Sequence, residues 1–376
     1  MTITEKIEQI RSEWKEKLCI LGHYYQRDAV LNHADFVGDS LELAKKAAAA
    51  KEAEKIVFCG VHFMAESADI LSDEHQTVYM PDPNAGCPMA DMAPMREVIK
   101  AWEEITGGSG RSRAGIPTDR SVATEPFDSA QGLEPVERRD GHLDSTPWIP
   151  IAYVNSTAAL KAFCGEHGGA TCTSSNAVKV FDFFLKQNKK ILFLPDEHLG
   201  ANTAHDLGLP DDAVAVFNPS LAQGGLNLDQ IKKAKILAWK GYCHVHMFSV
   251  DDIKRARAEH PDAKIIVHPE TPKEVLRLAD AHGSTSRIVK YVEEAKNGAT
   301  IVIGTEINLV TRLAARHRPR VAVHPLRPSM CRNMALTTEE KLLKVLENFP
   351  EENEIHVEPK LKTGAALALK RMLDIS

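Results

Sequence analysis

Three cysteines occupy equivalent positions in an internal repeat of the sequence: Cys87, Cys243 and Cys331. Each comes after a short apolar run that is typical of a buried β-strand, and a polar or helical stretch follows it. Three thiolates, one from each repeat, would leave one position of a metal ion or iron–sulfur cluster without a protein ligand. An open position is typical of catalytic sites, whereas structural zinc sites use four protein ligands. The spacing therefore predicts a catalytic metal or iron–sulfur centre.

The other four cysteines have a simpler interpretation. Cys19 and Cys59 lie inside apolar runs, and Cys164 and Cys172 flank a segment of small residues, so we expect small buried hydrophobic side chains. The chain has 7 cysteines and no Cys-x-x-Cys pair. That pattern argues against zinc ribbons, thioredoxin-like sites and ferredoxin-type cluster motifs. An odd number of cysteines without a signal-peptide core indicates reduced thiols, and we expect a cytoplasmic protein.

Composition and charge exclude several classes of protein. The 376 residues are 43% hydrophobic and 26% charged, which is typical of a globular chain with two or three domains. A net charge of −6 without a basic block argues against nucleic acid as a partner. No apolar run approaches the roughly 18 to 20 residues that cross a membrane. Glycine-rich phosphate loops are absent, so we expect no nucleotide cofactor.

The cysteines belong to three successive units of similar pattern. In each unit, runs rich in Val, Ile and Leu alternate with helical patterns, which indicates parallel strands buried on both faces. We therefore predict an α/β fold of three similar αβα sandwich units, with small parallel sheets around a pseudo-threefold axis. The predicted units span residues 1–95, 96–244 and 245–376, and the last includes a C-terminal helical extension.

Two stretches fall outside this pattern. Residues 104–147 are rich in Gly, Ser, Pro, Arg and Asp and have few large apolar side chains. We predict that they form a disordered insertion in the second unit, because they cannot bury enough apolar surface to fold alone. The second unit is also long before Cys243, and the sequence leaves the path of residues 205–235 open.

Two sets of polar side chains recur near the predicted ends of the strands. Those at the ends of the first strands are His23, Tyr25, Tyr153, Asn155, His268 and Glu270. Those at the starts of the following helices are Ser40, Ser174 and Thr285. Ligands of parallel α/β sheets bind outside the carboxyl ends of the strands, and a helix start offers free N–H groups to anions. We therefore predict one active site where the three units meet, although the three hydroxyl groups also suit N-cap positions.

Further polar groups have two open interpretations. Asp196 and Glu306 follow the third strands of units two and three, and Glu66 lies a little further along in unit one. These carboxylates either line the cavity or hold helix ends. His244 and His246 follow Cys243 closely, and the sequence leaves open whether they support the site.

Short motifs along nearly the whole chain resemble, in the same order, those of the quinolinate synthase family. They are GHYYQ, DFVGDSLELA, FMAE, CPMA, YVNSTA, CTSSNA, PDEHLG, CHVH, VHPE, GSTS, IGTE and CRNM. The resemblance implies three αβα domains around a central 4Fe–4S cluster, held by one cysteine from each domain. It implies condensation of iminoaspartate with dihydroxyacetone phosphate to quinolinate, with loss of phosphate and two waters. The insertion at 104–147 lies outside the common core of the family.

The resemblance also assigns residues and partners. Cys87, Cys243 and Cys331 look like the cluster ligands. The substrate-contacting set implied for this chain is His23, Tyr25, Ser40, Tyr153, Asn155, Ser174, His268, Glu270 and Thr285. The L-aspartate oxidase that supplies iminoaspartate becomes a candidate for transient contact.

The residue types suit the chemistry of two dehydrations and a ring closure. These steps need a proton removed next to a carbonyl or imine and hydroxide leaving groups activated. We assign general base and acid work to Glu270 and His268, with Tyr25 assisting proton transfer. An iron that lacks a cysteine ligand would act as a Lewis acid for a substrate oxygen.

The hydroxyl and amide groups suit substrate binding. Ser40, Ser174 and Thr285, with the N–H groups of the helix starts, would hold the phosphate and carboxylates. Tyr153 and Asn155 would orient the substrate chain for cyclisation.

Two alternatives stay open on the sequence. The first is a divalent-metal lyase or aldolase that uses His23, His268 and Glu270 as ligands, but it leaves the spacing of the cysteines unexplained. The second is a non-enzymatic iron–sulfur sensor, which explains the cysteines but not the polar strand ends.

Overall fold

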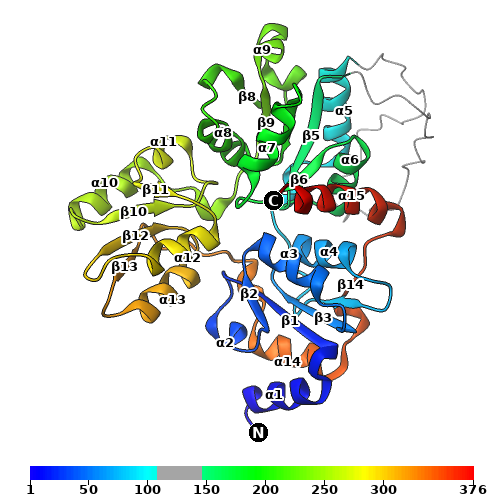
Figure 1. Cartoon of the computed structure of the whole chain (residues 1–376), viewed down its shortest axis with the longest axis vertical. Coiled ribbons are helices and arrows are strands. Elements are labelled where there is room, and N and C mark those ends of the chain that lie inside the picture. Colours follow the sequence, from blue (N-terminus) through cyan, green and yellow to red (C-terminus); the bar gives the residue numbers. More distant parts are fainter. Residues whose placement is uncertain (108–145) are drawn as a thin grey trace, which may run out of the picture.

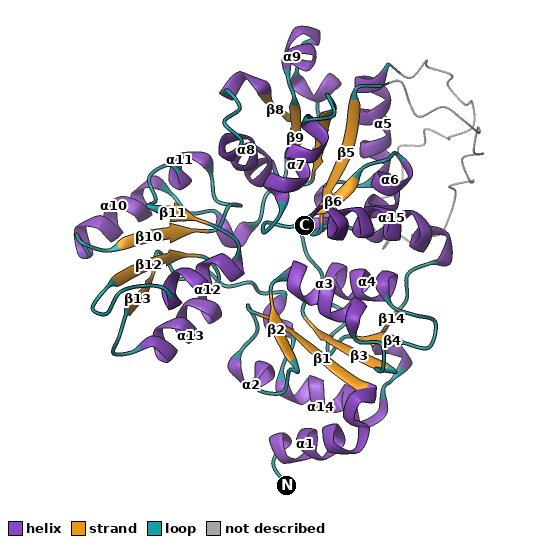
Figure 2. Ribbon diagram, in the orientation of Figure 1, coloured by secondary structure: helices purple, strands orange, loops and turns teal. Residues whose placement is uncertain are grey.

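The structure, a computed structural model, describes residues 1–107 and 146–376 and has three lobes around a common centre (Figure 1). Each lobe contains one sheet flanked by helices, which confirms the predicted α/β fold of repeated αβα units (Figure 2). Of the predicted insertion at 104–147, residues 108–145 lie outside the described part of the chain. The first residues of that stretch are helical, because α5 (Met95–Thr106) continues until Gly107 ends it with a left-handed φ of 71°.

The first sheet contains the N-terminal strands and one strand from near the C-terminus. Its strands are β1 (Leu18–His23), β2 (Phe36–Gly38), β3 (Lys55–Cys59), β4 (Thr77–Tyr79) and β14 (Glu354–Ile355). The helices of this part of the chain are α1 (Ile3–Trp14), α2 (Asp28–Leu31), α3 (Ser40–Ala49) and α4 (His62–Leu71). All residues of β1 are buried, as expected for a central strand covered on both faces.

The second sheet contains an additional strand that the sequence did not locate. Its strands are β5 (Trp148–Tyr153), β6 (Ala170–Cys172), β7 (Lys190–Leu194), β8 (Val214–Phe217) and β9 (Ile236–Trp239). Its helices after α5 are α6 (Ala158–Glu166), α7 (Ala177–Leu185), α8 (Glu197–Asp206) and α9 (Leu228–Lys233). Residues 205–235, whose path was open, therefore finish α8, add the edge strand β8 and form α9.

The third sheet is the smallest. Its strands are β10 (Lys264–Val267), β11 (Ala281–His282), β12 (Thr300–Gly304) and β13 (Ala322–Pro325). Its helices are α10 (Val250–Glu259), α11 (Lys273–Leu276), α12 (Thr285–Glu293) and α13 (Ile307–His317).

Four parallel strands follow the same order in every sheet. The orders are β2-β1-β3-β4, β6-β5-β7-β9 and β11-β10-β12-β13. In the second sheet β8 is added in parallel beside β9, and in the first sheet β14 is added antiparallel beside β4. The internal repeat of the sequence therefore corresponds to a repeated sheet topology.

The C-terminal extension packs on the first two lobes. Thr338 caps α14 (Glu339–Asn348), which packs beside α1 and α2. β14 then joins the first sheet, and α15 (Pro359–Ile375) lies against α6 and β6 of the second lobe (Figure 1). The boundaries between the predicted units stay predictions. No helix in the described residues is long and apolar enough to cross a membrane.

The contact between α6 and α15 depends on two glycines. A Cβ atom on Gly165 would lie 1.9 Å from the carbonyl oxygen of Gly364, so even alanine would force the helices apart. We expect Gly165→Ala to lower the free energy of unfolding by about 1–3 kcal/mol, as overpacking does. Urea unfolding of the protein, kept without oxygen, measures this change.

Leu367→Ala is the matched control, because this residue lies on α15 with 47% of its surface exposed. Its effect should stay within about 0.5 kcal/mol. Equal changes for both variants would contradict a tight helix crossing at Gly165.

Candidate functional site

One cavity lies at the centre of the molecule, where loops at the carboxyl ends of the three sheets meet. The empty space at this point, including space that is open to solvent, is about 680 Å³. Every residue predicted for the site lines it: His23, Tyr25, Ser40, Cys87, Tyr153, Asn155, Ser174, Cys243, His268, Glu270, Thr285 and Cys331. The structure thus brings together side chains that are far apart in the sequence, at the sheet ends where α/β proteins bind ligands.

Strand pairing shows that the polar strand ends are equivalent in the three sheets. In each lobe the first strand in chain order pairs with the third: β1 with β3, β5 with β7 and β10 with β12. The last residue pairs of these ladders are Gly22–Cys59, Ala152–Leu194 and Val267–Gly304. One residue after these positions come His23, Tyr153 and His268, and two residues later come Tyr25, Asn155 and Glu270. Two of the three turns are alike in detail, because the amides of Tyr25 and Glu270 donate to Nδ1 of His23 and His268 at 3.2 and 3.4 Å.

A chain of hydrogen bonds runs along the cavity wall. The Tyr153 hydroxyl donates to one carboxylate oxygen of Glu270, and Nδ1 of His246 lies 2.7 Å from the other. Nε2 of His246 lies 3.2 Å from the Tyr25 hydroxyl, which is 2.8 Å from Oγ1 of Thr305. Because a carboxylate only accepts hydrogen bonds, Nδ1 of His246 donates to Glu270, and in the neutral ring Nε2 is an acceptor. Glu270 and Tyr25 are therefore connected through one imidazole ring.

Burial sets the protonation states around this chain. It raises the pKa of Tyr25 and of Tyr153 well above the usual range, so both hydroxyls keep their protons. It lowers the pKa of His268 to about 3, which leaves a neutral ring. Burial alone would raise the pKa of Glu270, but His268, His246 and the hydrogen bonds from His246 and Tyr153 outweigh it and lower that pKa. Glu270 therefore stands as a carboxylate beside the protonated hydroxyls of Tyr25 and Tyr153.

The three hydroxyl residues at the helix starts are not N-caps, so that alternative is wrong. Ser40 and Thr285 are the first residues of their helices, and Asp39 and Ser284 accept the capping bonds instead. Ser174 lies before α7, whose N-cap position belongs to Asn176. Capping therefore does not explain why these hydroxyl groups line the cavity.

The acidic residues of open role hold helix ends. Asp196 accepts from the amide of Leu199 at 2.8 Å, and Glu306 accepts from the amide of Asn308 at 2.7 Å. Glu66 accepts from the amide of Ala158 at 3.2 Å. None of these three carboxylates lines the cavity.

The three cysteines of the repeat have similar surroundings in the three lobes. Cys87, Cys243 and Cys331 follow β4, β9 and β13, and all three thiols are free. A short 3₁₀ turn comes next in each case: Ala90–Met92, His244–His246 and Met334–Leu336. Backbone N–H groups in and beside these turns hydrogen-bond to the sulfur atoms and offset part of the rise in thiol pKa that burial causes. Such N–H groups stabilise thiolates that hold iron–sulfur clusters.

The electrostatics of the thiols also fit a metal centre. Burial dominates over these N–H groups: it raises the pKa of Cys87 to about 12, and it raises the pKa of Cys243 and Cys331 as well. Three thiolates in one buried cavity would repel one another, so they need a positively charged partner, and metal ligation deprotonates thiols. Cys19, Cys59, Cys164 and Cys172 are buried, as predicted.

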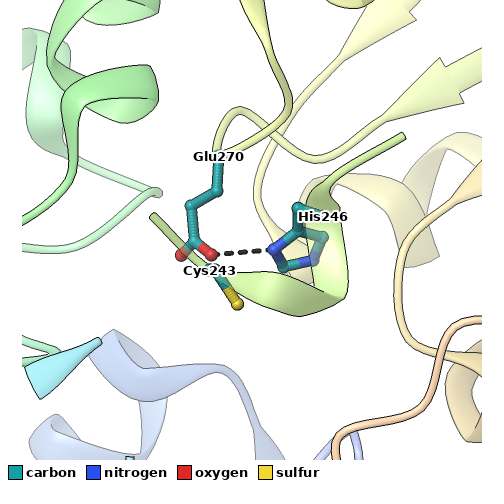
Figure 3. Close-up of side chains that lie close together, drawn as sticks. All are labelled: Cys243, His246 and Glu270. Atoms are coloured by element: carbon teal, nitrogen blue, oxygen red, sulfur yellow. Dashed lines mark hydrogen bonds and ion pairs between the residues drawn. The ribbon is translucent and has the colours of Figure 1, made fainter. Parts of the chain in front are cut away.

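Cys243 also belongs to a tighter group with His246 and Glu270 (Figure 3). One ligand atom from each of these residues lies within 4.8 Å of the others, and within the described residues no other group of three metal-ligating side chains is this close. Thiolate, imidazole and carboxylate are all transition-metal ligands. A single ion would fit these three atoms, whereas Cys87 and Cys331 lie outside the group.

Two members of the chain of hydrogen bonds were not among the residues predicted for the site. His246 had been left undecided, although it follows a predicted ligand by three residues. Thr305 comes directly after β12, where the equivalent residues Gly60 and Pro195 carry no hydroxyl group. The hydroxyl group of Thr305 is therefore not repeated in the other two units, and the internal repeat does not point to it.

Comparison with known proteins agrees with the resemblance seen in the sequence. The family model described as quinolinate synthetase A protein matches residues 5–374. A quinolinate synthase of Corynebacterium glutamicum is 43% identical over 98% of this chain and 86% of its own length. Relatives with the same name from Halalkalibacterium halodurans and Acidobacterium capsulatum are each 43% identical, over 99% and 100% of this chain and 93% of their lengths. The chain belongs to the quinolinate synthetase A family of enzymes, and this family implies a metal cofactor.

Proposed function

We propose that the chain is a quinolinate synthase of de novo NAD biosynthesis that condenses iminoaspartate with dihydroxyacetone phosphate. One phosphate and two waters leave, which balances the atoms of the two substrates against quinolinate. The observation that carries the proposal is the meeting of three equivalent cysteines with the Tyr153–Glu270–His246–Tyr25 chain in one cavity. A cytoplasmic location and a transient contact with L-aspartate oxidase stay predictions.

Cys87, Cys243 and Cys331 are the proposed ligands of a 4Fe–4S cluster. When bound, the cluster supplies an iron without a cysteine ligand, which serves as a Lewis acid for a substrate oxygen. The thiols suit this role because each comes from a different lobe and each faces backbone N–H groups. Their shared cavity also contains the proposed acid–base groups.

Glu270 is the proposed general base. Its carboxylate takes a proton from the carbon next to the carbonyl or imine, and the hydrogen bond to Nδ1 of His246 stabilises its charge. The Tyr25 hydroxyl, which keeps its proton, donates to a leaving hydroxide, and Nε2 of His246 lies within reach to share that proton. His268 stacks on His246 with ring centroids 4.2 Å apart and assists as a neutral proton donor.

The remaining residues are proposed to bind and orient the substrates. Ser40 and Thr285 are the first residues of α3 and α12, and their hydroxyl groups line the cavity, where they would hold the phosphate and carboxylates. Ser174, on the equivalent loop before α7, contributes a further hydroxyl. Tyr153 and Asn155 orient the substrate chain for ring closure, and His23 completes the wall on the first lobe.

A divalent-metal lyase is the rival that an observation favours. The ligands first considered for it were His23, His268 and Glu270, but the side chains that gather most closely are Cys243, His246 and Glu270. Nδ1 of His246 and the Glu270 carboxylate already satisfy each other in a hydrogen bond of 2.7 Å. The rival also gives no role to Cys87 and Cys331.

We expect the protein purified without oxygen to be brown and to contain about four iron and four sulfide ions per chain. It should form quinolinate from iminoaspartate and dihydroxyacetone phosphate. Visible spectra, iron and sulfide counts and a quinolinate assay measure these properties. A colourless protein that works with one divalent ion would support the lyase, and a brown protein without quinolinate formation would support a sensor.

A further inference from the structure

The loop that carries Glu270 is held by a side chain from the preceding lobe. Asn202 of α8 donates both hydrogens of its amide group, to the carbonyl oxygens of Pro269 and of Thr271, each at 2.8 Å. Its surface is 0% exposed, so no water competes for these bonds. The two carbonyls belong to the residues directly before and after Glu270. Asn202 therefore binds the backbone on both sides of this residue.

The loop that carries Tyr25 is held in the same way. Arg312 of α13 donates from Nη1 to the carbonyl oxygen of Tyr24 at 2.8 Å and from Nη2 to that of Gln26 at 2.5 Å. Nε forms an ion pair with Asp28, which orients the guanidinium, and only 4% of the arginine is exposed. The two carbonyls again belong to the residues on either side of the proposed catalytic group.

We call each of these side chains, Asn202 and Arg312, a clamp, because each binds the two carbonyl groups on either side of one residue. The two clamps occupy equivalent places in the repeat. Asn202 comes six residues after Asp196, the N-cap of α8, and Arg312 comes six residues after Glu306, the N-cap of α13. Tyr25 and Glu270 are themselves equivalent by the strand pairing. Different side chains therefore form the same backbone contact twice, once from the second lobe to the third and once from the third lobe to the first.

The remaining pair of lobes lacks this contact. In the first lobe the equivalent position is Ser67, six residues after Val61, the N-cap of α4. Its hydroxyl donates to the carbonyl oxygen of Phe63 in its own helix. The loop with Asn155 is held within its own lobe, where Lys161 donates to the carbonyl oxygen of Ser156. The clamps between lobes thus serve the two loops with proposed acid–base groups.

We propose that Asn202 and Arg312 are positioning residues that hold the Glu270 carboxylate and the Tyr25 hydroxyl at the reacting atoms. This inference rests on the proposed function of Glu270 and Tyr25. Both clamps bind backbone, so neither needs to touch the substrate. A displacement of about 1 Å in an acid–base group is enough to lower turnover by about 10²-fold.

Asn202→Leu and Arg312→Met remove the donors with little change in volume. We expect kcat to fall on the order of 10²-fold, with KM changed little and the iron and sulfide contents of the protein unchanged. Arg312→Lys keeps one cationic donor, and its kcat should lie between those of wild type and Arg312→Met. This conservative variant also serves if Arg312→Met does not fold.

Two matched controls remove similar backbone clamps elsewhere. Asn353 donates to the carbonyl oxygens of Met80 and Pro81, and Arg320 donates to those of Val292 and Ala295. Asn353→Leu and Arg320→Met should lower stability as much as the site variants do. Their kcat should nevertheless stay within about threefold of wild type, because neither holds a loop with an acid–base group.

The outcomes separate this inference from the proposed function. The test of the positioning role requires that the wild-type protein forms quinolinate and that Tyr25→Phe loses activity. If Asn202→Leu and Arg312→Met, with full clusters, then keep the wild-type kcat, the positioning role is overturned. Equal losses of kcat in the site variants and the controls would also overturn it, because general destabilisation would then suffice. A wild-type protein with its cluster that forms no quinolinate would instead remove the proposed function.

Discussion

Cys243→Ser is expected to abolish the iron–sulfur cluster and quinolinate formation together. Serine has nearly the same shape as cysteine, but its alkoxide is a poorer ligand for iron, and the cavity offers no fourth cysteine to replace it. Cys87→Ser and Cys331→Ser should have the same effect, because the three residues are equivalent in the repeat. Iron and sulfide counts, visible spectra and turnover of proteins prepared without oxygen measure the loss.

Cys59→Ser and Cys164→Ser are the matched controls for this series. Both cysteines are buried away from the cavity, and we expect each variant to keep its cluster and activity. Stability should fall by about 1–3 kcal/mol where the new hydroxyl group finds no partner. A Cys243→Ser protein with a full cluster and normal turnover would disprove a model in which each lobe contributes one ligand.

Tyr25→Phe should lower the rate of quinolinate formation on the order of 10²- to 10⁴-fold, the usual contribution of a positioned acid or base. The change removes only the hydroxyl group that contacts His246 and Thr305, and the ring keeps its place. The pKa of this hydroxyl is raised by burial, so it keeps its proton at neutral pH, as the proposed role of donor requires. Single-turnover rates with counted clusters would isolate the chemical step.

Tyr79→Phe is the control, because Tyr79 is also buried and its hydroxyl accepts a hydrogen bond from Lys55 far from the cavity. This variant should turn over at the wild-type rate. If Tyr25→Phe with its cluster also kept that rate, Tyr25 would have no part in proton transfer, and His246 would need another partner.

Much of the site could be predicted because its residues follow the repeat. His23, Tyr153 and His268 each stand at the same point of a first strand, and parallel sheets direct that point toward the ligand. The same reasoning located the cysteines, since Cys87 and its equivalents follow the fourth strand in each sheet. A topology that is used three times therefore made the sequence unusually informative.

Features between lobes could not be predicted in this way. Arg312 is one of several arginines in a helical pattern, and only the folded structure shows that it reaches the carbonyls beside Tyr25. The sequence also left open whether Ser40 and Thr285 are N-caps, because the true caps Asp39 and Ser284 have side chains as suitable as those of their neighbours. The return of the C-terminal segment depends on β14, a strand of two residues that has no local pattern.

That return has a consequence for biosynthesis on the ribosome. Until β14 emerges, β4 is an open edge of the first sheet, and open edges readily pair with other chains. Nascent chains fold from the N-terminus, so this edge stays uncovered while the second and third lobes are translated. Cys87 lies in the loop after β4, and Cys331 is itself translated late. The proposed cluster, which needs a thiolate from each lobe, would therefore be completed only after Cys331 has been translated.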